Sequence, residues 1–83
     1  MGTFAFDVYY AAPVDEAREQ RILGVVGSHS GRLDFRELPD PGRSVVSNAV
    51  CLTYEFDDFD TAVRAEAAVR AIGEHAEGVY EYG

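Results

Sequence analysis

The sequence predicts a single α+β domain in which two helices cover one face of a four-stranded antiparallel sheet. In two segments, 4–10 and 50–56, apolar side chains alternate with polar or small ones, which is the period of a strand with one buried face. A stretch with apolar residues at helical spacing follows each segment. The domain is expected to span 1–83, because a chain of 83 residues has the length of one domain.

A near-repeat relates the two halves of the chain. Residues of similar type recur 46 positions apart, as in Phe4 and Val50, Leu23 and Val69, Gly27 and Gly73, and His29 and His75. Two copies of a strand–helix–strand unit specify an architecture but no reaction. Function is therefore expected at positions where the two halves differ.

The first half contains a strand, a helix and a second strand. The first strand is expected over 3–11 and ends before Pro13, because proline lacks the amide donor that a strand needs. A helix follows near Asp15, whose charge suits the positive end of a helix dipole. Gly27 or Gly31 is expected to end this helix.

The second strand is expected over 32–38, and Pro39–Gly42 is a strong turn signal. The segment 44–48 is either the far arm of a long hairpin or a mobile loop. The third strand follows over 48–56 and alternates cleanly between apolar and other residues.

The second helix is expected over 61–75, where alanines and apolar residues recur at helical spacing. Asp58 or Asp60 is its expected N-cap. A short strand over 79–82 completes the order β-α-β-β-α-β.

This order resembles the ferredoxin-like βαββαβ fold. The resemblance implies an antiparallel four-stranded sheet with two helices on one face. It also implies that the strands 3–11 and 48–56 are central and run as parallel neighbours. Many unrelated functions use this fold, so the resemblance says little about function.

The charge of the chain excludes several classes of partner. The chain has fifteen acidic and seven basic residues and thus a net charge of −8. This charge argues against binding to nucleic acid and to anionic membrane surfaces. No segment approaches the roughly 18 apolar residues of a membrane span, and the N-terminus has no basic region of a signal peptide. One cysteine allows no internal disulfide. These features predict a cytoplasmic protein.

The helix-free face of the sheet is the predicted functional surface. Once the apolar sets face the helices, the alternate residues face away. Those that we assign to ligand binding or to a subunit interface are Asp7, Tyr9, Arg36, Cys51, Thr53 and Glu55. Ala5 and Asp34 are expected on the same face. Such a face can be solvated, pack on another sheet or hold a small ligand.

Three of these residues, Asp7, Tyr9 and Glu55, are weak candidates for acid–base catalysis. Asp7 and Glu55 could lie close together, and paired carboxylates in a dry site separate their pKa values. The simpler interpretation is two solvated acids offset by Arg36. Cys51 is interpreted as a small core or interface residue, because nothing beside it is expected to lower the pKa of its thiol.

The two histidines, His29 and His75, are weak candidate metal ligands at matching helix ends, where Glu74 and Glu77 could join them. The simpler interpretation is that a histidine suits the negative end of a helix dipole. The chain has no known metal-ligand spacing, so no metal and no cofactor are expected.

Families with this fold carry motifs that the chain lacks. Heavy-metal-binding domains have a C-x-x-C pair where this chain has Ala11–Val14, and ACT-type amino-acid-binding domains usually have a glycine in that loop. Acylphosphatases need an arginine there, whereas the nearest, Arg18, lies in the predicted helix. RNA-recognition motifs need several aromatic residues on the open face, and only Tyr9 is placed there. Dimeric α/β-barrel enzymes pack two open sheets together, and that assembly stays open.

These features favour a small non-enzymatic module that self-associates and has a regulatory, scaffolding or small-ligand-binding role. A homodimer is expected, because a domain of this size buries only about 60% of its unfolded surface and a second copy would cover more. Two alternatives stay open. The chain could be a small cofactor-independent enzyme of the dimeric α/β-barrel type, or an acidic inhibitor or immunity-type protein that binds a basic partner.

Overall fold

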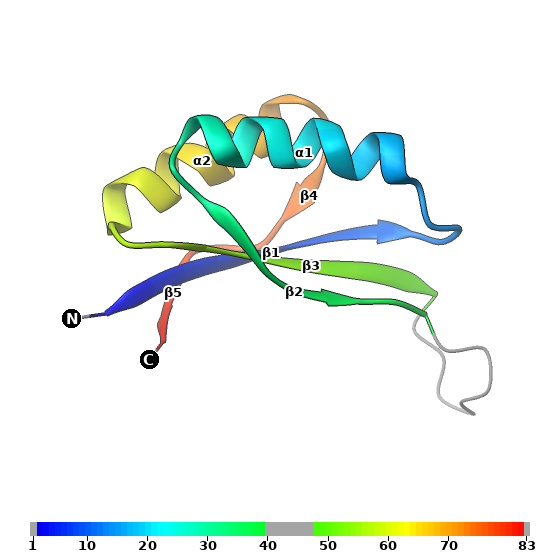
Figure 1. Ribbon diagram of the computed structural model, residues 1–83, viewed down its shortest axis with the longest axis horizontal. Coiled ribbons are helices and arrows are strands. Elements are labelled where there is room, and N and C mark those ends of the chain that lie inside the picture. The colour runs from blue at the N-terminus through cyan, green and yellow to red at the C-terminus, as the bar shows by residue number, and fades with distance from the viewer. Residues whose placement is uncertain (1, 40–47, 83) are drawn as a thin grey trace.

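The computed structural model describes residues 2–39 and 48–82. Its elements are β1 (Thr3–Ala11), α1 (Glu16–Ser28), β2 (Arg32–Glu37), β3 (Ala49–Phe56), α2 (Phe59–Ala71), β4 (His75–Ala76) and β5 (Tyr80–Tyr82). Both helices lie on the same side of the sheet (Figure 1). The expected turn at 39–42 and the segment 44–48 fall largely outside the described residues. Within the described ranges, no helix is long and apolar enough to cross a membrane.

The strands form one sheet in the order β2-β3-β1-β4, with β5 also paired to β1. This confirms the predicted ferredoxin-like α+β fold. The expectation of parallel central strands is wrong, because β1 and β3 are antiparallel, with Phe4 opposite Phe56 and Ala11 opposite Ala49. Since β3 is antiparallel to both neighbours, β1 and β2 run parallel to each other, as strands joined by a crossover helix do.

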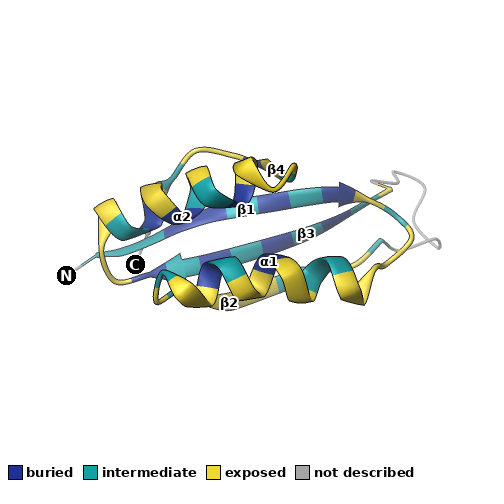
Figure 2. Ribbon diagram, turned by 90° about the horizontal axis from the view of Figure 1, so that it is seen from above, coloured by how far each residue is buried: buried dark blue, intermediate teal, exposed yellow. Residues whose placement is uncertain are grey.

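The core lies between the sheet and the helices, as the alternation of the two central strands predicts. The strand residues that fill it are Phe6, Val8, Tyr10, Val50, Leu52, Tyr54 and Phe56, each at most 4% exposed. Phe6 stacks on Phe56 with ring centroids 5.5 Å apart. Phe4 is only partly buried and meets Phe59 of α2 edge-on. Seen from above in Figure 2, the buried residues of β1 and β3 run between the two helices.

The helices follow a shorter offset than the strands. α1 and α2 are displaced by 43 residues, because the ends of β1 and β3 lie 45 residues apart and the linker to α2 is two residues shorter than the linker to α1. This offset pairs buried Ile22 with buried Ala65, and buried Val26 with buried Val69. Leu23, which the 46-residue offset matches to Val69, is 37% exposed. The near-repeat therefore holds for the strands and fails for the helices.

The ends of the helices differ from the sequence expectation. α2 begins after Asp58, whose carboxylate accepts a hydrogen bond from the amide of Thr61 at 2.9 Å, and it ends at Ala71 instead of His75. In each half, a residue in the left-handed region follows the last helical turn: Ser30 (φ 63°) after α1 and Gly73 (φ 92°) after α2. Neither expected glycine ends α1.

A bulge in β2 reverses the faces of that strand. Leu33 pairs with Tyr54, but Phe35 pairs with Thr53, so Asp34 is an extra residue between them. From this point Phe35 lies on the helix-free face, and Arg36 lies opposite the buried Leu52 on the helix side. The expectation that Arg36 shares the helix-free face is therefore wrong.

The fourth strand is interrupted. β4 pairs with β1 at Val8 and Tyr9, and β5 pairs with β1 at 3–5. Between them, the amide of Glu77 donates to the carbonyl of Asp7 at 3.0 Å. The predicted strand over 79–82 corresponds to β5, whereas the predicted helix over 61–75 includes His75, the first residue of β4.

Candidate ligand-binding face

The helix-free face of the sheet carries acidic, basic, aromatic and small side chains. By register, its described members are Arg32, Phe35 and Glu37 from β2, Cys51, Thr53 and Glu55 from β3, Ala5, Asp7 and Tyr9 from β1, and His75 and Tyr80 from β4 and β5. Both helices cover the opposite side (Figure 1). Five of the six predicted site residues therefore share one surface, and Arg36 does not.

Asp7 lies at the centre of this face and is held by two hydroxyl groups. Thr53 donates to Asp7 Oδ1 at 2.6 Å from the neighbouring strand, and Tyr80 donates to the same oxygen at 3.2 Å from β5. Both donors fix the orientation of the carboxylate. Oδ2 accepts no hydrogen bond from any residue in the part of the chain that the structure describes. The carboxylate is thus anchored through one oxygen and can accept from a ligand through the other.

Glu55 does not form a carboxylate pair with Asp7. The register places Glu55 opposite Ala5, two pairs along the strands from Asp7 and Thr53. Arg32 of β2 donates to Glu55 Oε1 at 2.6 Å and also reaches Asp57 at 3.1 Å. Asp7 and Glu55 therefore bind different partners and do not form the acid–base pair that the sequence allowed.

Tyr9 and Cys51 are opposite each other in the register, and both resist ionisation. Burial, aided by the nearby thiol and by Asp7, raises the pKa of the Tyr9 phenol to about 12. Burial and the charge of Asp7 raise the pKa of the Cys51 thiol. Both groups therefore stay protonated at neutral pH, which suits a hydrogen-bonding surface better than a nucleophile.

We expect Cys51 to react slowly with a thiol reagent such as dithionitrobenzoate in the folded protein at about pH 8, because the thiolate is the reactive form. Asp7→Asn should accelerate labelling, since it removes a negative charge that raises the thiol pKa. Unfolded protein in denaturant gives the reference rate. Labelling of the folded protein as fast as this reference, or no change in Asp7→Asn, would contradict this assignment.

The two histidines are not brought together. His29 follows α1 on the helix side, and its Nδ1 lies 2.9 Å from the carbonyl of Val25. His75 lies in β4 opposite Tyr9, with the two ring centroids 6.3 Å apart on the helix-free face. Among the described residues, no group of three or more histidine, cysteine or acidic side chains is placed to hold a metal ion.

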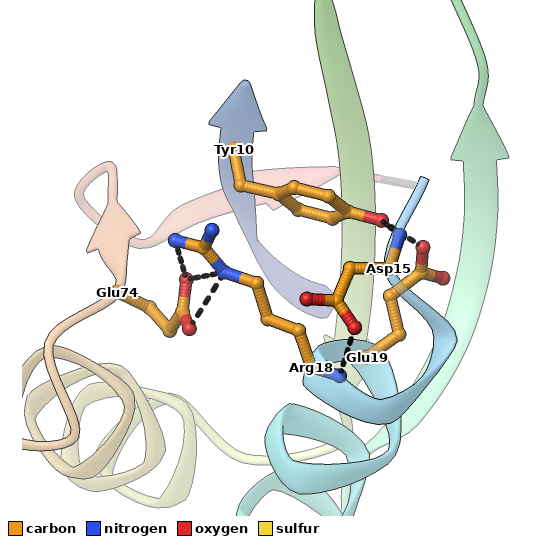
Figure 3. A network of polar contacts seen from close by, with 5 residues as sticks. All are labelled: Tyr10, Asp15, Arg18, Glu19 and Glu74. Carbon is orange, nitrogen blue, oxygen red and sulfur yellow. Dashed lines mark hydrogen bonds and ion pairs between the residues drawn. The ribbon is translucent and has the colours of Figure 1, made fainter. Parts of the chain in front are cut away.

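A second polar network, which sequence reasoning did not predict, lies on the helix side of the sheet (Figure 3). Tyr10 donates its hydroxyl to Glu19 and accepts from the backbone amide of Asp15 at 3.0 Å. Arg36, turned to this side by the bulge, binds both carboxylate oxygens of Glu19 at 2.7 and 3.1 Å. The bulge thus ties β2 to α1.

Arg18 links the two helical halves. Its guanidinium binds the carboxylate of Glu74, just after α2, with Nε 2.9 Å from both carboxylate oxygens, and lies 4.8 Å from the ring centroid of Tyr10 (Figure 3). A bidentate pair of this kind is well suited to fix geometry. Next to this network, a surface hollow of about 440 Å³ is lined by Glu16, Ala17, Glu19, Gln20 and Arg36. Two of its charged side chains, Glu19 and Arg36, already bind each other, so we assign the network to structure.

The Glu19 network makes a prediction about acid stability. The hydrogen bonds from Arg36 hold the pKa of the Glu19 carboxyl below its usual range. A lowered folded pKa gives stability that is present above the unfolded value and is lost as pH falls through the folded value. Glu19→Gln should therefore lower the melting temperature near neutral pH, and the difference from wild type should shrink in acid. Thermal melts across this range test it. A difference that stays constant would contradict it.

Sequence reasoning missed five residues of the helix-free face, which are Arg32, Phe35, Glu37, His75 and Tyr80. Phe35 is 55% exposed and Tyr80 is 41% exposed there. The alternation Tyr80-Glu81-Tyr82 could have placed Tyr80 on this side. The periodicity of β2 does not predict the bulge that places Phe35 on the helix-free face.

Comparison with known proteins supports the fold. No family model and no curated protein sequence matches the chain. A de novo designed protein, Foldit4, matches with a TM-score of 0.59 and 18% identity over 99% of this chain and 96% of that one.

Two natural proteins match with TM-scores slightly below that of Foldit4. The ACT domain from GTP pyrophosphokinase of Chlorobium tepidum has a TM-score of 0.53 and 8% identity, over 99% of this chain and all of that one. The regulatory subunit of aspartate kinase from Thermus flavus has a TM-score of 0.51 and 16% identity, over 95% of this chain and 55% of that one. The chain therefore has the ferredoxin-like fold that these structures share.

Proposed function

We propose that the protein is a small non-enzymatic module that self-associates and binds a small ligand on its helix-free face, with a regulatory role in the cytoplasm. The observation that carries this proposal is the anchored carboxylate of Asp7, which Thr53 and Tyr80 hold at the centre of a face that neither helix covers. The likeness in fold to the regulatory subunit of an aspartate kinase supports the regulatory part.

The chemistry of the face favours a ligand with a positively charged amine. A carboxylate accepts hydrogen bonds from an ammonium group, and aromatic faces attract cations. Three aromatic side chains, Tyr9, Phe35 and Tyr80, lie on the same face as Asp7. The net charge of −8 further attracts a cation.

The same residues argue for binding over catalysis. The Tyr9 phenol and the Cys51 thiol have raised pKa values, so neither is primed as a base or nucleophile. Glu55 binds Arg32 and does not pair with Asp7. We therefore favour a binding module over an enzyme of the dimeric α/β-barrel type.

Calorimetry with two probes of opposite charge tests the ligand proposal. Phenethylammonium and phenylacetate carry the same ring, and only the ammonium compound should bind. Asp7→Asn should weaken its binding by about tenfold or more, because a hydrogen bond to a charged group contributes roughly 1.5–3 kcal/mol. Asp60→Asn, on α2, changes the net charge equally and is the control. Equal binding of both probes, no binding, or equal weakening by the two variants would overturn the proposal.

A further inference from the structure

The two edges of the sheet are protected unequally. The strand order leaves β2 at one edge, and β4 with β5 at the other. β4 and β5 are two and three residues long, and an interrupted edge of this kind discourages pairing with another chain. β2 runs for six residues and pairs only with β3 among the described strands. Its outer edge presents backbone groups that another strand can bind.

The β2 edge also concentrates exposed apolar side chains. Leu33 is 42% exposed on the helix side, Phe35 is 55% exposed on the helix-free side, and Leu38 just after the strand is 47% exposed. Neither lysine nor proline occurs in 32–37, although these are common protectors of edge strands. Apolar groups on both sides of an edge are what an added strand would cover.

Charge favours a second copy of the chain as the added strand. The chain as a whole carries −8, yet β2 has two arginines and two acids and is neutral. In an antiparallel copy, Phe35 can lie opposite its own copy, and two strands without net charge meet with no net repulsion. Pairing two helix-free faces instead would bring together two surfaces that each carry three carboxylates, of Asp7, Glu37 and Glu55, and one arginine, Arg32, and like charges at an interface are costly.

We propose that two copies of the chain pair antiparallel through β2, so that one sheet continues through both copies. This inference rests on the self-association in the proposed function and names its surface. The pairing covers Leu33 and the edge of Phe35 and leaves Asp7 open on both copies. Because α1 lies above β2 (Figure 2), the two α1 helices come to lie on the same side of the shared sheet.

Sedimentation velocity of four single variants tests this interface. Wild type should sediment as a species of twice the 9.1 kDa chain mass. Leu33→Lys places a charge on the edge and should weaken the dimer by at least about tenfold, as the loss of an interface anchor does. Phe35→Lys tests the same edge from the helix-free side and replaces Leu33→Lys if that variant does not fold. Circular dichroism shows whether each variant is folded.

Two matched controls separate this surface from its competitors. Val63→Lys changes a residue of α2 with 40% exposure, and Tyr80→Lys changes one of 41% exposure on the helix-free face, away from β2. Both should leave the dimer intact. Equal or greater weakening by Tyr80→Lys would indicate face-to-face pairing, and by Val63→Lys pairing through the helices, and either would overturn the β2 interface. A wild-type monomer at all concentrations would overturn self-association itself, whereas ligand binding by calorimetry is measured independently.

Discussion

Phe6→Ala is expected to destabilise the fold by about 3–5 kcal/mol, the usual cost of emptying a fully buried phenylalanine site. Phe6 has no exposed surface, stacks on Phe56 at 5.5 Å between ring centroids and lies 6.0 Å from the ring of Tyr54. Its site is bounded by strand and helix residues that cannot all collapse into the space. Because a domain of this kind has only about 5–15 kcal/mol of stability, much of it should be lost.

Urea denaturation followed by circular dichroism measures this loss. Phe59→Ala is the control, since Phe59 is 49% exposed and meets only Phe4 among the ring contacts of the described chain. It should cost about 1 kcal/mol. If both variants lost the same small amount, the core would not lie between the sheet and the helices as described.

Gly31→Ala is expected to destabilise the protein by about 1–3 kcal/mol, the cost of overpacking a filled core. A β-carbon at Gly31 would lie 2.3 Å from the ring of Phe56 and 2.6 Å from the side chain of Val26. Both neighbours are fully buried, and Phe56 is held by its stack on Phe6. Neither can move without disturbing the core.

Gly27→Ala is the matched control for this prediction. Gly27 lies within α1, and a β-carbon there meets no heavy atom within 4 Å apart from its own chain neighbours and the nearby backbone of α1. Alanine should therefore stabilise the helix by roughly 0.5–1 kcal/mol. The two variants should shift the urea midpoint in opposite directions. A shift in the same direction for both would mean that the close approach of Gly31 to Phe56 is absent.

The strands could be predicted from the sequence because their signal is local. Alternation from Phe4 to Tyr10 and from Val50 to Phe56 fixes which face is buried, and the structure keeps that register. The helix offset was misjudged because matching residue types, such as His29 and His75, suggested an equivalence that the linker lengths remove.

The composition of the candidate face could be predicted only in part. Asp7, Tyr9 and Thr53 follow from alternation in regular strands. Arg36 and Phe35 do not, because a bulge is decided by packing against the neighbouring strand and not by the strand's own pattern. Arg36 then binds Glu19, and Arg18 binds Glu74. Both pairs join residues that are far apart in the sequence, so no local pattern predicts them.

Ligands are expected to bind on the helix-free face around Asp7, and amide NMR during titration with phenethylammonium tests this binding most directly. The predicted result is a saturable shift of the amides of Asp7, Cys51 and Thr53, which share that face, and its loss in Asp7→Asn. Shifts centred instead on Glu16, Ala17 and Gln20, around the hollow between α1 and β2, would contradict it.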